Sequence, residues 1–327
     1  MGSSVSTNNG HSYRKKGSLK TISPRKLSAN LEINQNSSDQ HTQTTTERVI
    51  KAGREFHNDT KSAYWFPIDD EEQDRLVGEH FAIKALFNGN VPEDVVERYF
   101  SLDAPARILD VGCGPGTWIM DVATELPNSE LVGIDMIDIF PSDIRPSNVS
   151  FKLNNVLDGI SFPSDSFDAV HFRFFNLALR SEEWLPVLKE IYRVLKPGGL
   201  IFSKEPSALR EGNEFFKYVA KAFVDKMVAS GQDPLIDEHI EKYMKEVGFE
   251  VVQHEQKHVD LSKSESLSKE FLWNLKMVCK SAQPYLADHL GVPHEHYSTF
   301  LERLDVELRN KPACIWSFTS TVGRKPL

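Results

Sequence analysis

Cysteine is scarce in this sequence, and the spacing of its cysteines argues against two common kinds of site. The chain has 327 residues and only three cysteines, Cys113, Cys279 and Cys314. They form neither a CxxC pair nor an even-numbered disulfide framework. The histidines of the C-terminal half also lack metal-ligand spacing on one helix face. We therefore expect reduced intracellular thiols, no structural zinc and no other metal site.

Long apolar runs and an excess of basic residues are missing as well. No stretch is apolar for long enough to span a bilayer, and no signal-peptide pattern opens the chain. The formal net charge is −9, which argues against nucleic acid as the main partner because phosphate binding needs a basic face. We expect a soluble or peripheral cytoplasmic protein that does not bind nucleic acid.

Residues 1–60 are rich in Ser, Thr, Asn and Gln, a composition that predicts a disordered tail. Six basic residues precede the first acidic one, Glu32: Arg14, Lys15, Lys16, Lys20, Arg25 and Lys26. The opening Met1-Gly2-Ser3-Ser4-Val5-Ser6 matches the pattern for N-myristoylation of Gly2. One acyl chain together with a basic segment predicts peripheral membrane contact. The alternatives are a plain disordered tail and a nuclear-import signal at Arg14-Lys15-Lys16.

The stretch RILDVGCGPGTW, from Arg107 to Trp118, predicts a buried strand that leads into a tight turn. Gly112, Gly114 and Gly116 tolerate positive φ and let a ligand lie against the main chain. The helix that follows points its N-terminal amides into the same space. A small polar ligand is expected to bind there.

The type of ligand follows from what this loop lacks and from two acids beside it. No Lys-Ser/Thr pair follows the last glycine, so a nucleoside triphosphate is disfavoured. The spacing is G-x-G-x-G rather than the dinucleotide pattern G-x-G-x-x-G. Asp110 would repel a pyrophosphate but suits an ammonium, and Asp135, which ends the next apolar run LVGID, can accept hydrogen bonds from both ribose hydroxyls. An adenosine that bears an amino-acid tail fits both acids.

Four stretches in this order resemble the successive motifs of the class I (seven-strand) S-adenosylmethionine-dependent methyltransferases. They are ILDVGCGPGTW, LVGIDM, NNVLDGISFPSDSFDAVHFRF and EIYRVLKPGGLIFSKEP. The upstream stretch YWFPIDDEEQDRLVGEHFAIKALF is similar to the entry segment of the fungal LaeA-like regulators of secondary metabolism. The resemblance implies an α/β fold: a doubly wound, Rossmann-like, seven-stranded and mostly parallel sheet with a reversed last strand. Helical additions would lie at the N-terminus and between the late strands.

The expected organisation has three parts. A basic tail covers 1–60, a helical cap 61–100, and a methyltransferase domain 101–327, with a cofactor half at 101–206 and acceptor-side helices and last strands at 207–327. Two prolines in MIDIFPSDIRPSN predict that the crossover after the second strand is a loop. The acids that begin the helix after Asp69 are interpreted as a solvated first turn.

The resemblance also implies site residues. Its cofactor, S-adenosylmethionine, would be held by Tyr64, Asp110, Gly112, Cys113, Gly114, Pro115, Gly116, Asp135, Met136, Asn155, Val156 and Arg173. Asn155 would accept a hydrogen bond from the adenine amino group. Asn176 and Glu205 fall at or just after strand ends, where open α/β sheets place ligands, and Glu205 or His80 is the candidate base. His171 lies within a strand and is interpreted as a hydrogen-bonded core residue.

The predicted function is transfer of the sulfonium methyl group to an unidentified acceptor, with a small molecule favoured over a protein. The cofactor carries its own activated leaving group, so the protein mainly aligns donor and acceptor and excludes water. Two alternatives remain: a regulatory protein that binds S-adenosylmethionine with little turnover, and an NAD-dependent oxidoreductase. The glycine spacing and Asp110 disfavour the second.

Overall fold

The computed structural model describes residues 47–99 and 104–327. The predictions on the acylation pattern, the basic cluster and the disorder of residues 1–46 lie outside the described residues. Within the described part, no helix is both long and apolar enough to cross a membrane.

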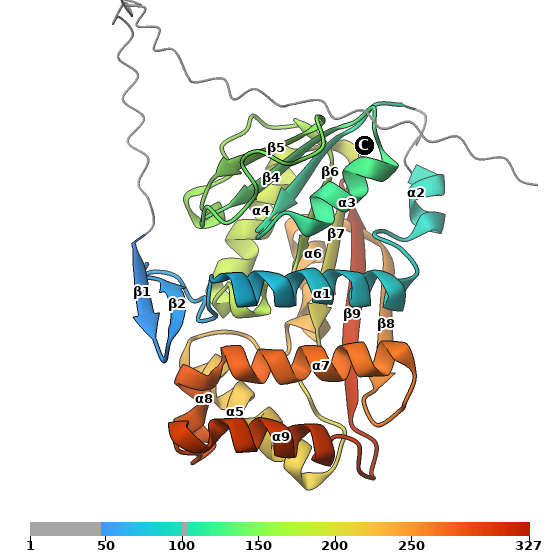
Figure 1. Ribbon diagram of the computed structural model, residues 1–327. Helices are drawn as coiled ribbons and strands as arrows, with labels where there is room; N and C mark the ends of the chain where they lie inside the picture. Colours follow the sequence, from blue (N-terminus) through green and yellow to red (C-terminus); the bar gives the residue numbers. More distant parts are fainter. Residues whose placement is uncertain (1–46, 100–103) are drawn as a thin grey trace, which may run out of the picture. The chain divides into compact units, whose positions relative to one another are not determined.

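A seven-stranded sheet forms the centre of the structure, in the order β5-β4-β3-β6-β7-β9-β8 (Figure 1). Its strands are β3 (Arg107–Val111), β4 (Glu130–Asp135), β5 (Val149–Leu153), β6 (Phe167–Arg173), β7 (Leu195–Pro206), β8 (Glu250–Asp260) and β9 (Ile315–Arg324). The pairs among β5, β4, β3, β6 and β7 are parallel, whereas β9 is antiparallel to both of its neighbours. The predicted Rossmann-like sheet with a reversed last strand is confirmed.

The helices are α1 (Asp70–Phe87), α2 (Glu93–Tyr99), α3 (Thr117–Glu125), α4 (Trp184–Val194), α5 (Glu214–Ala229), α6 (Ile236–Val247), α7 (Ser266–Ser281), α8 (Gln283–His289) and α9 (Tyr297–Glu307). The loop predicted between β4 and β5 is present, because no helix lies between Asp135 and Val149.

Alternation along the strands explains why helices cover both faces of the sheet. Successive side chains of a strand point to opposite faces. In β3, Ile108 packs in the cluster that contains α2 and α3, whereas Leu109 and Val111 pack in the cluster that contains α4 and α6. The amphipathic spacing of α4 places Trp184 and Leu188 in that second cluster as well.

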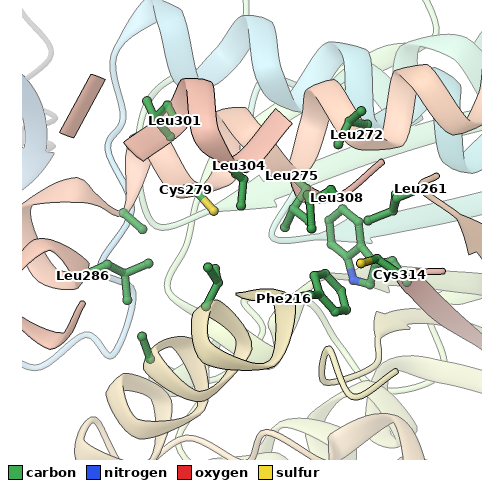
Figure 2. Packing of buried hydrophobic residues seen from close by; sticks show 14 of the residues in the cluster. Phe216, Leu261, Leu272, Leu275, Cys279, Leu286, Leu301, Leu304, Leu308 and Cys314 are labelled. Carbon is green, nitrogen blue, oxygen red and sulfur yellow. The ribbon is translucent and has the colours of Figure 1, made fainter. Parts of the chain in front are cut away.

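A third apolar cluster joins the N-terminal and C-terminal additions. It contains residues of α1, α5, α7, α8 and α9. Figure 2 shows its centre, where Phe216 of α5, Leu275 of α7 and Leu304 of α9 lie close to Cys314 before β9. Helix α1 packs along α7 (Figure 1). The late helices are therefore anchored to the cap rather than to the sheet alone.

Two elements differ from the sequence predictions. Residues 47–60 were expected to belong to the disordered tail, but β1 (Arg48–Lys51) and β2 (Arg54–His57) form an antiparallel hairpin. Ala52 and Gly53 make its turn with φ values of 47° and 75°, and Phe56 is buried at 2% exposure. The composition averaged over 60 residues is polar and therefore did not reveal these two short strands. Helix α2 was not foreseen either.

Candidate functional site

A cavity of about 260 Å³ opens beside the loops that follow β3, β4, β5, β6 and β7. Most of the predicted cofactor residues line it: Tyr64, Gly112, Cys113, Gly114, Pro115, Asp135, Met136, Asn155, Val156 and Arg173. Asp110 and Gly116 do not, and neither do the two candidate bases. The carboxyl ends of the parallel strands thus bring together residues from positions 112 to 173, at the place where open α/β sheets bind ligands, and Tyr64 joins them from the segment before α1.

The glycine loop after β3 needs its glycines for different reasons. Gly112, Gly114 and Gly116 all have positive φ, at 64°, 53° and 75°. A Cβ on Gly112 would lie 2.5 Å from the Phe175 ring, and one on Gly116 would lie 2.6 Å from the Phe151 ring. On Gly114 the nearest atom would be Leu76 Cδ1 at 4.0 Å. Gly114 is therefore the position where a ligand can approach the backbone. Gly116 instead has to be a glycine because the loop packs against the Phe151 ring there.

Asp135 ends β4 with its carboxylate at the cavity. Its Oδ2 accepts the backbone N–H of Gly114 at 2.8 Å, and its Oδ1 accepts that of Ile137 at 3.0 Å. The backbone N–H of Met136 also donates to this carboxylate. A carboxylate has about four acceptor sites, so acceptor capacity remains for a ligand. Burial raises the pKa of this group, and these backbone hydrogen bonds oppose the rise.

Asp110 does not face the cavity. Its Oδ1 lies 2.8 Å from Nδ1 of His171, the neighbouring residue on β6. Asp110 is 3% exposed and His171 1% exposed, and the Trp118 ring stacks on His171 at 3.7 Å between centroids. Burial raises the pKa of Asp110 to about 8. The interpretation of His171 as a core residue is confirmed, whereas the predicted contact between Asp110 and a ligand ammonium has no support in this geometry.

Asn155 lines the cavity, but its side chain already has a local role. Its Oδ1 accepts the N–H of Leu157 at 3.0 Å and caps the short helix η1 (Val156–Asp158). The oxygen predicted to accept from an adenine amino group is thus partly engaged. Met136, Ile137 and Val156 add apolar surface beside Asp135.

His80 is fully buried on α1 and lies outside the cavity. Its Nε2 is 3.0 Å from Asp121 Oδ2, and its Nδ1 is 3.2 Å from Nη1 of Arg173. Burial, and then the charge of Arg173, lower the pKa of His80 to about 4. A neutral ring that donates from Nε2 to Asp121 and accepts at Nδ1 from Arg173 satisfies both contacts. His80 therefore has no free nitrogen to serve as a base and instead holds Arg173.

Glu205 lies near the end of β7 but turns away from the cavity. Its Oε1 accepts the N–H of Phe175, and its Oε2 accepts the N–H of Asn176, both at 3.0 Å. It is 0% exposed, and burial raises its pKa to about 8 against these two hydrogen bonds. The predicted catalytic role has no geometric support, because both oxygens hold the turn that follows β6.

A buried charged cluster on α1 is the main feature that the sequence prediction missed. Arg75 bonds Glu72 on one side and Glu79 on the other, with N···O distances of 2.7 and 2.9 Å. All three line the cavity, and Glu72 is 1% exposed. The prediction of a solvated first turn is wrong for Glu72, whose Oε2 accepts the hydroxyl of Ser281 on α7. The i, i+3 and i+7 spacing was visible in the sequence, but nothing there indicated that α7 covers this face.

The comparisons with known proteins agree with this geometry. Residues 108–199 match the family model for a methyltransferase domain. This stretch, which runs from β3 into β7, is therefore similar to methyltransferase domains. The chain is 33% identical over 154 residues to the "Secondary metabolism regulator laeA" of Coprinopsis cinerea. This alignment covers 47% of this chain and 38% of that relative. The chain is 25% identical over 217 residues to the "Protein-methionine methyltransferase laeA" of Emericella nidulans, which covers 62% and 54%.

The chain therefore spans about half or less of the length of these curated relatives. Among solved structures, a Haemonchus contortus phosphoethanolamine N-methyltransferase 2, in complex with S-adenosyl-L-methionine, aligns with a TM-score of 0.50. The alignment covers 84% of this chain and 62% of that one at 19% identity, so it shows the fold alone.

Proposed function

We propose that this chain is a methyltransferase that uses S-adenosylmethionine. The observation that carries the proposal is Asp135, whose carboxylate is oriented by backbone amides and lines the cavity with acceptor capacity left over. Gly114 lies beside it with room for a ligand against the main chain. A ribose with two hydroxyls fits the carboxylate, and the apolar side chains of Met136, Ile137 and Val156 fit a flat base.

Arg173 completes the polar contacts that the proposed cofactor needs. Arg173 lines the cavity, and its Nη1 donates to Nδ1 of His80, which leaves other N–H donors of the guanidinium for a ligand. A guanidinium in this state is suited to the carboxylate of an amino-acid tail. Burial lowers the pKa of Arg173, and the charge of Asp110 opposes that change.

The bound cofactor would supply an activated methyl group. The chain's own residues therefore have to orient the cofactor and the acceptor, enclose both and exclude water. Leu76 of α1, Phe174 after β6 and Leu209 after β7 line the same cavity and restrict water on its acceptor side. No buried base is required, which agrees with the structural roles of Glu205 and His80.

The acceptor is proposed to be a small molecule. The alternative is a regulatory protein that binds the cofactor with little turnover, and it is favoured by the printed names of several relatives, which are secondary metabolism regulators. Binding alone does not separate the two, because an intact site does not imply transfer.

Product formation separates the two functions. The full chain is incubated with methyl-labelled S-adenosylmethionine and a small-molecule extract, beside the variant Gly114→Val, whose side chain would fill the free space at that residue. We expect labelled small molecules with the parent chain only. If the parent chain binds S-adenosylhomocysteine but labels nothing, the result would instead support the regulatory role. If the parent chain does not bind S-adenosylhomocysteine, both functions would be contradicted.

A further inference from the structure

Many of the residues that line the cavity and follow Arg173 in the sequence are apolar, and we call them the wall. The side chains come from the loops after β6 and β7, from α5, from α7 and from β9: Phe174, Leu177, Leu209, Ala220, Phe223, Val224, Met227, Leu275, Val278 and Trp316. Several of these helices are fixed by the apolar cluster of Figure 2, to which Leu275 itself belongs. A hydrophilic ligand that entered this space would give up its hydration without replacement.

The polar groups next to this wall are already paired with one another. Ser207 donates its hydroxyl to Asp237 and accepts from Gln256. Glu72 is occupied by Arg75 and Ser281. Ser207 and Glu72 therefore need no ligand to satisfy their hydrogen bonds. The Oδ1 of Asp237 has no partner in the described part of the chain, but Asp237 does not line the cavity.

Asn176 is the exception. It lines the cavity, and its Oδ1 is buried without a hydrogen-bond partner in the described part of the chain. A buried amide that lacks a partner needs an explanation, because such groups are nearly always satisfied in native proteins. The side-chain amide has both a donor and an acceptor end, and the two are interchanged by rotation.

The backbone holds Asn176 in place by unusual means. Phe174 adopts a left-handed conformation with φ of 58°, which a bulky side chain seldom does. The buried carboxylate of Glu205 takes the N–H groups of both Phe175 and Asn176. A strained residue and a buried acid thus both fix the turn that places Phe174 and Asn176 at the same cavity.

We propose that the methyl acceptor is a small, mainly apolar molecule with a single hydroxyl or amine group, and that Asn176 orients this group. This inference rests on the proposed function. In the transfer, the acceptor oxygen or nitrogen forms a bond to the methyl carbon, the electron pair of the broken S–C bond stays on sulfur, and the acceptor proton leaves to solvent. Asn176 is a positioning residue, because it donates to or accepts from the acceptor without taking part in these bond changes.

The test uses 2-naphthol, which has two fused rings and one hydroxyl, as the probe. Its affinity for the full chain saturated with S-adenosylhomocysteine is measured by fluorescence, beside 2-methylnaphthalene, which lacks the hydroxyl, and phosphoethanolamine, which is strongly polar. We expect 2-naphthol to bind and phosphoethanolamine not to bind. In Asn176→Leu, the affinity for 2-naphthol should fall about tenfold, as for one lost hydrogen bond, while that for 2-methylnaphthalene stays within twofold.

Asn310→Leu, an exposed substitution outside the cavity, is the matched control, and circular dichroism checks the fold of both variants. Preferred binding of phosphoethanolamine, absence of 2-naphthol binding, or an unchanged affinity in Asn176→Leu would each overturn the inference while leaving the proposed function intact. Failure of the parent chain to bind S-adenosylhomocysteine would overturn the proposed function itself, and the inference with it.

Discussion

Asp135 is the residue on which the proposed cofactor site depends most. In Asp135→Ala, the carboxylate that would accept from the ribose is lost, and a hydrogen bond to a charged group contributes about 1.5–3 kcal/mol. We expect the affinity for S-adenosylmethionine to fall at least tenfold in calorimetric titration. Asp138→Ala, an exposed acid three residues later, should bind like the parent. If Asp135→Ala binds equally well, the ribose anchor has been assigned to the wrong residue.

Glu205 is expected to matter for stability rather than for chemistry. Glu205→Ala leaves the N–H groups of Phe175 and Asn176 without an acceptor, and each buried unsatisfied group costs about 1–3 kcal/mol. Glu205→Gln keeps one acceptor oxygen. Its free energy of unfolding in urea should therefore decrease less than that of Glu205→Ala. The exposed Glu250→Gln is the control. Undiminished stability with abolished turnover in Glu205→Gln would restore Glu205 as a base.

Glu205 also shows how far strand-end reasoning reaches at the scale of a single residue. Both Asp135 and Glu205 were selected because they end predicted strands. However, β7 continues to Pro206, and a shift of one position turns a strand side chain to the opposite face. The sequence therefore located the cavity edge correctly but could not decide which of the side chains there face the ligand.

At the scale of elements, helix α1 links the cap to the sheet through a histidine with an unusual ionisation. His80 bridges Asp121 of α3 and Arg173 of β6 in its neutral form, and burial lowers its pKa to about 4. The unfolded chain, with an ordinary pKa near 6.5, takes up the proton first. The contribution of His80 to stability is therefore present above about pH 6.5 and is lost as the pH falls toward 4.

We expect the free energy of unfolding to decrease by up to about 3 kcal/mol from this group over that interval. His80→Gln offers one donor and one acceptor without a proton to take up, so its stability should decline less on acidification. The exposed His289→Gln should follow the parent curve. Urea unfolding at several pH values measures all three, and parallel curves for His80→Gln and the parent would contradict the assigned ionisation.

The elements themselves followed from the apolar pattern where its ends were clear. Strand β3, the glycine turn, helix α3 and strand β4 fell close to their predicted positions, because apolar runs bounded by glycines indicate buried strands directly. The β1–β2 hairpin was not predicted, because its strands are short and adjoin a polar stretch of sequence. The charge pairs of α1 escaped because i, i+3 and i+4 pairs on a solvated helix have the same sequence pattern as pairs beneath a second helix.

At the scale of the whole molecule, the position of the cofactor site on the sheet was predictable from the sequence, but the apolar wall on the acceptor side was not. Four ordered motifs located the cofactor side near one edge of the sheet. The wall around Asn176 combines Phe223 of α5, Leu275 of α7 and Trp316 of β9. These contacts join segments about 50 to 140 residues apart from Asn176, and local periodicity carries no information about such pairings. Its apolar character became clear only from the folded chain.

A ligand that binds the folded chain and not the unfolded chain stabilises it by mass action. At a concentration 100 times its Kd, S-adenosylhomocysteine should add about 2.7 kcal/mol, which corresponds to a rise in Tm of about 5–10 °C for a domain of this size. NADH at the same concentration should leave the Tm unchanged, because the loop has the G-x-G-x-G spacing. Asp135→Ala should lose at least about half of the shift, because a tenfold weaker ligand at this concentration adds only about 1.4 kcal/mol, whereas Asp138→Ala should keep it. Thermal unfolding followed by circular dichroism measures each case, and a shift with NADH but not with S-adenosylhomocysteine would favour the oxidoreductase alternative over methyl transfer.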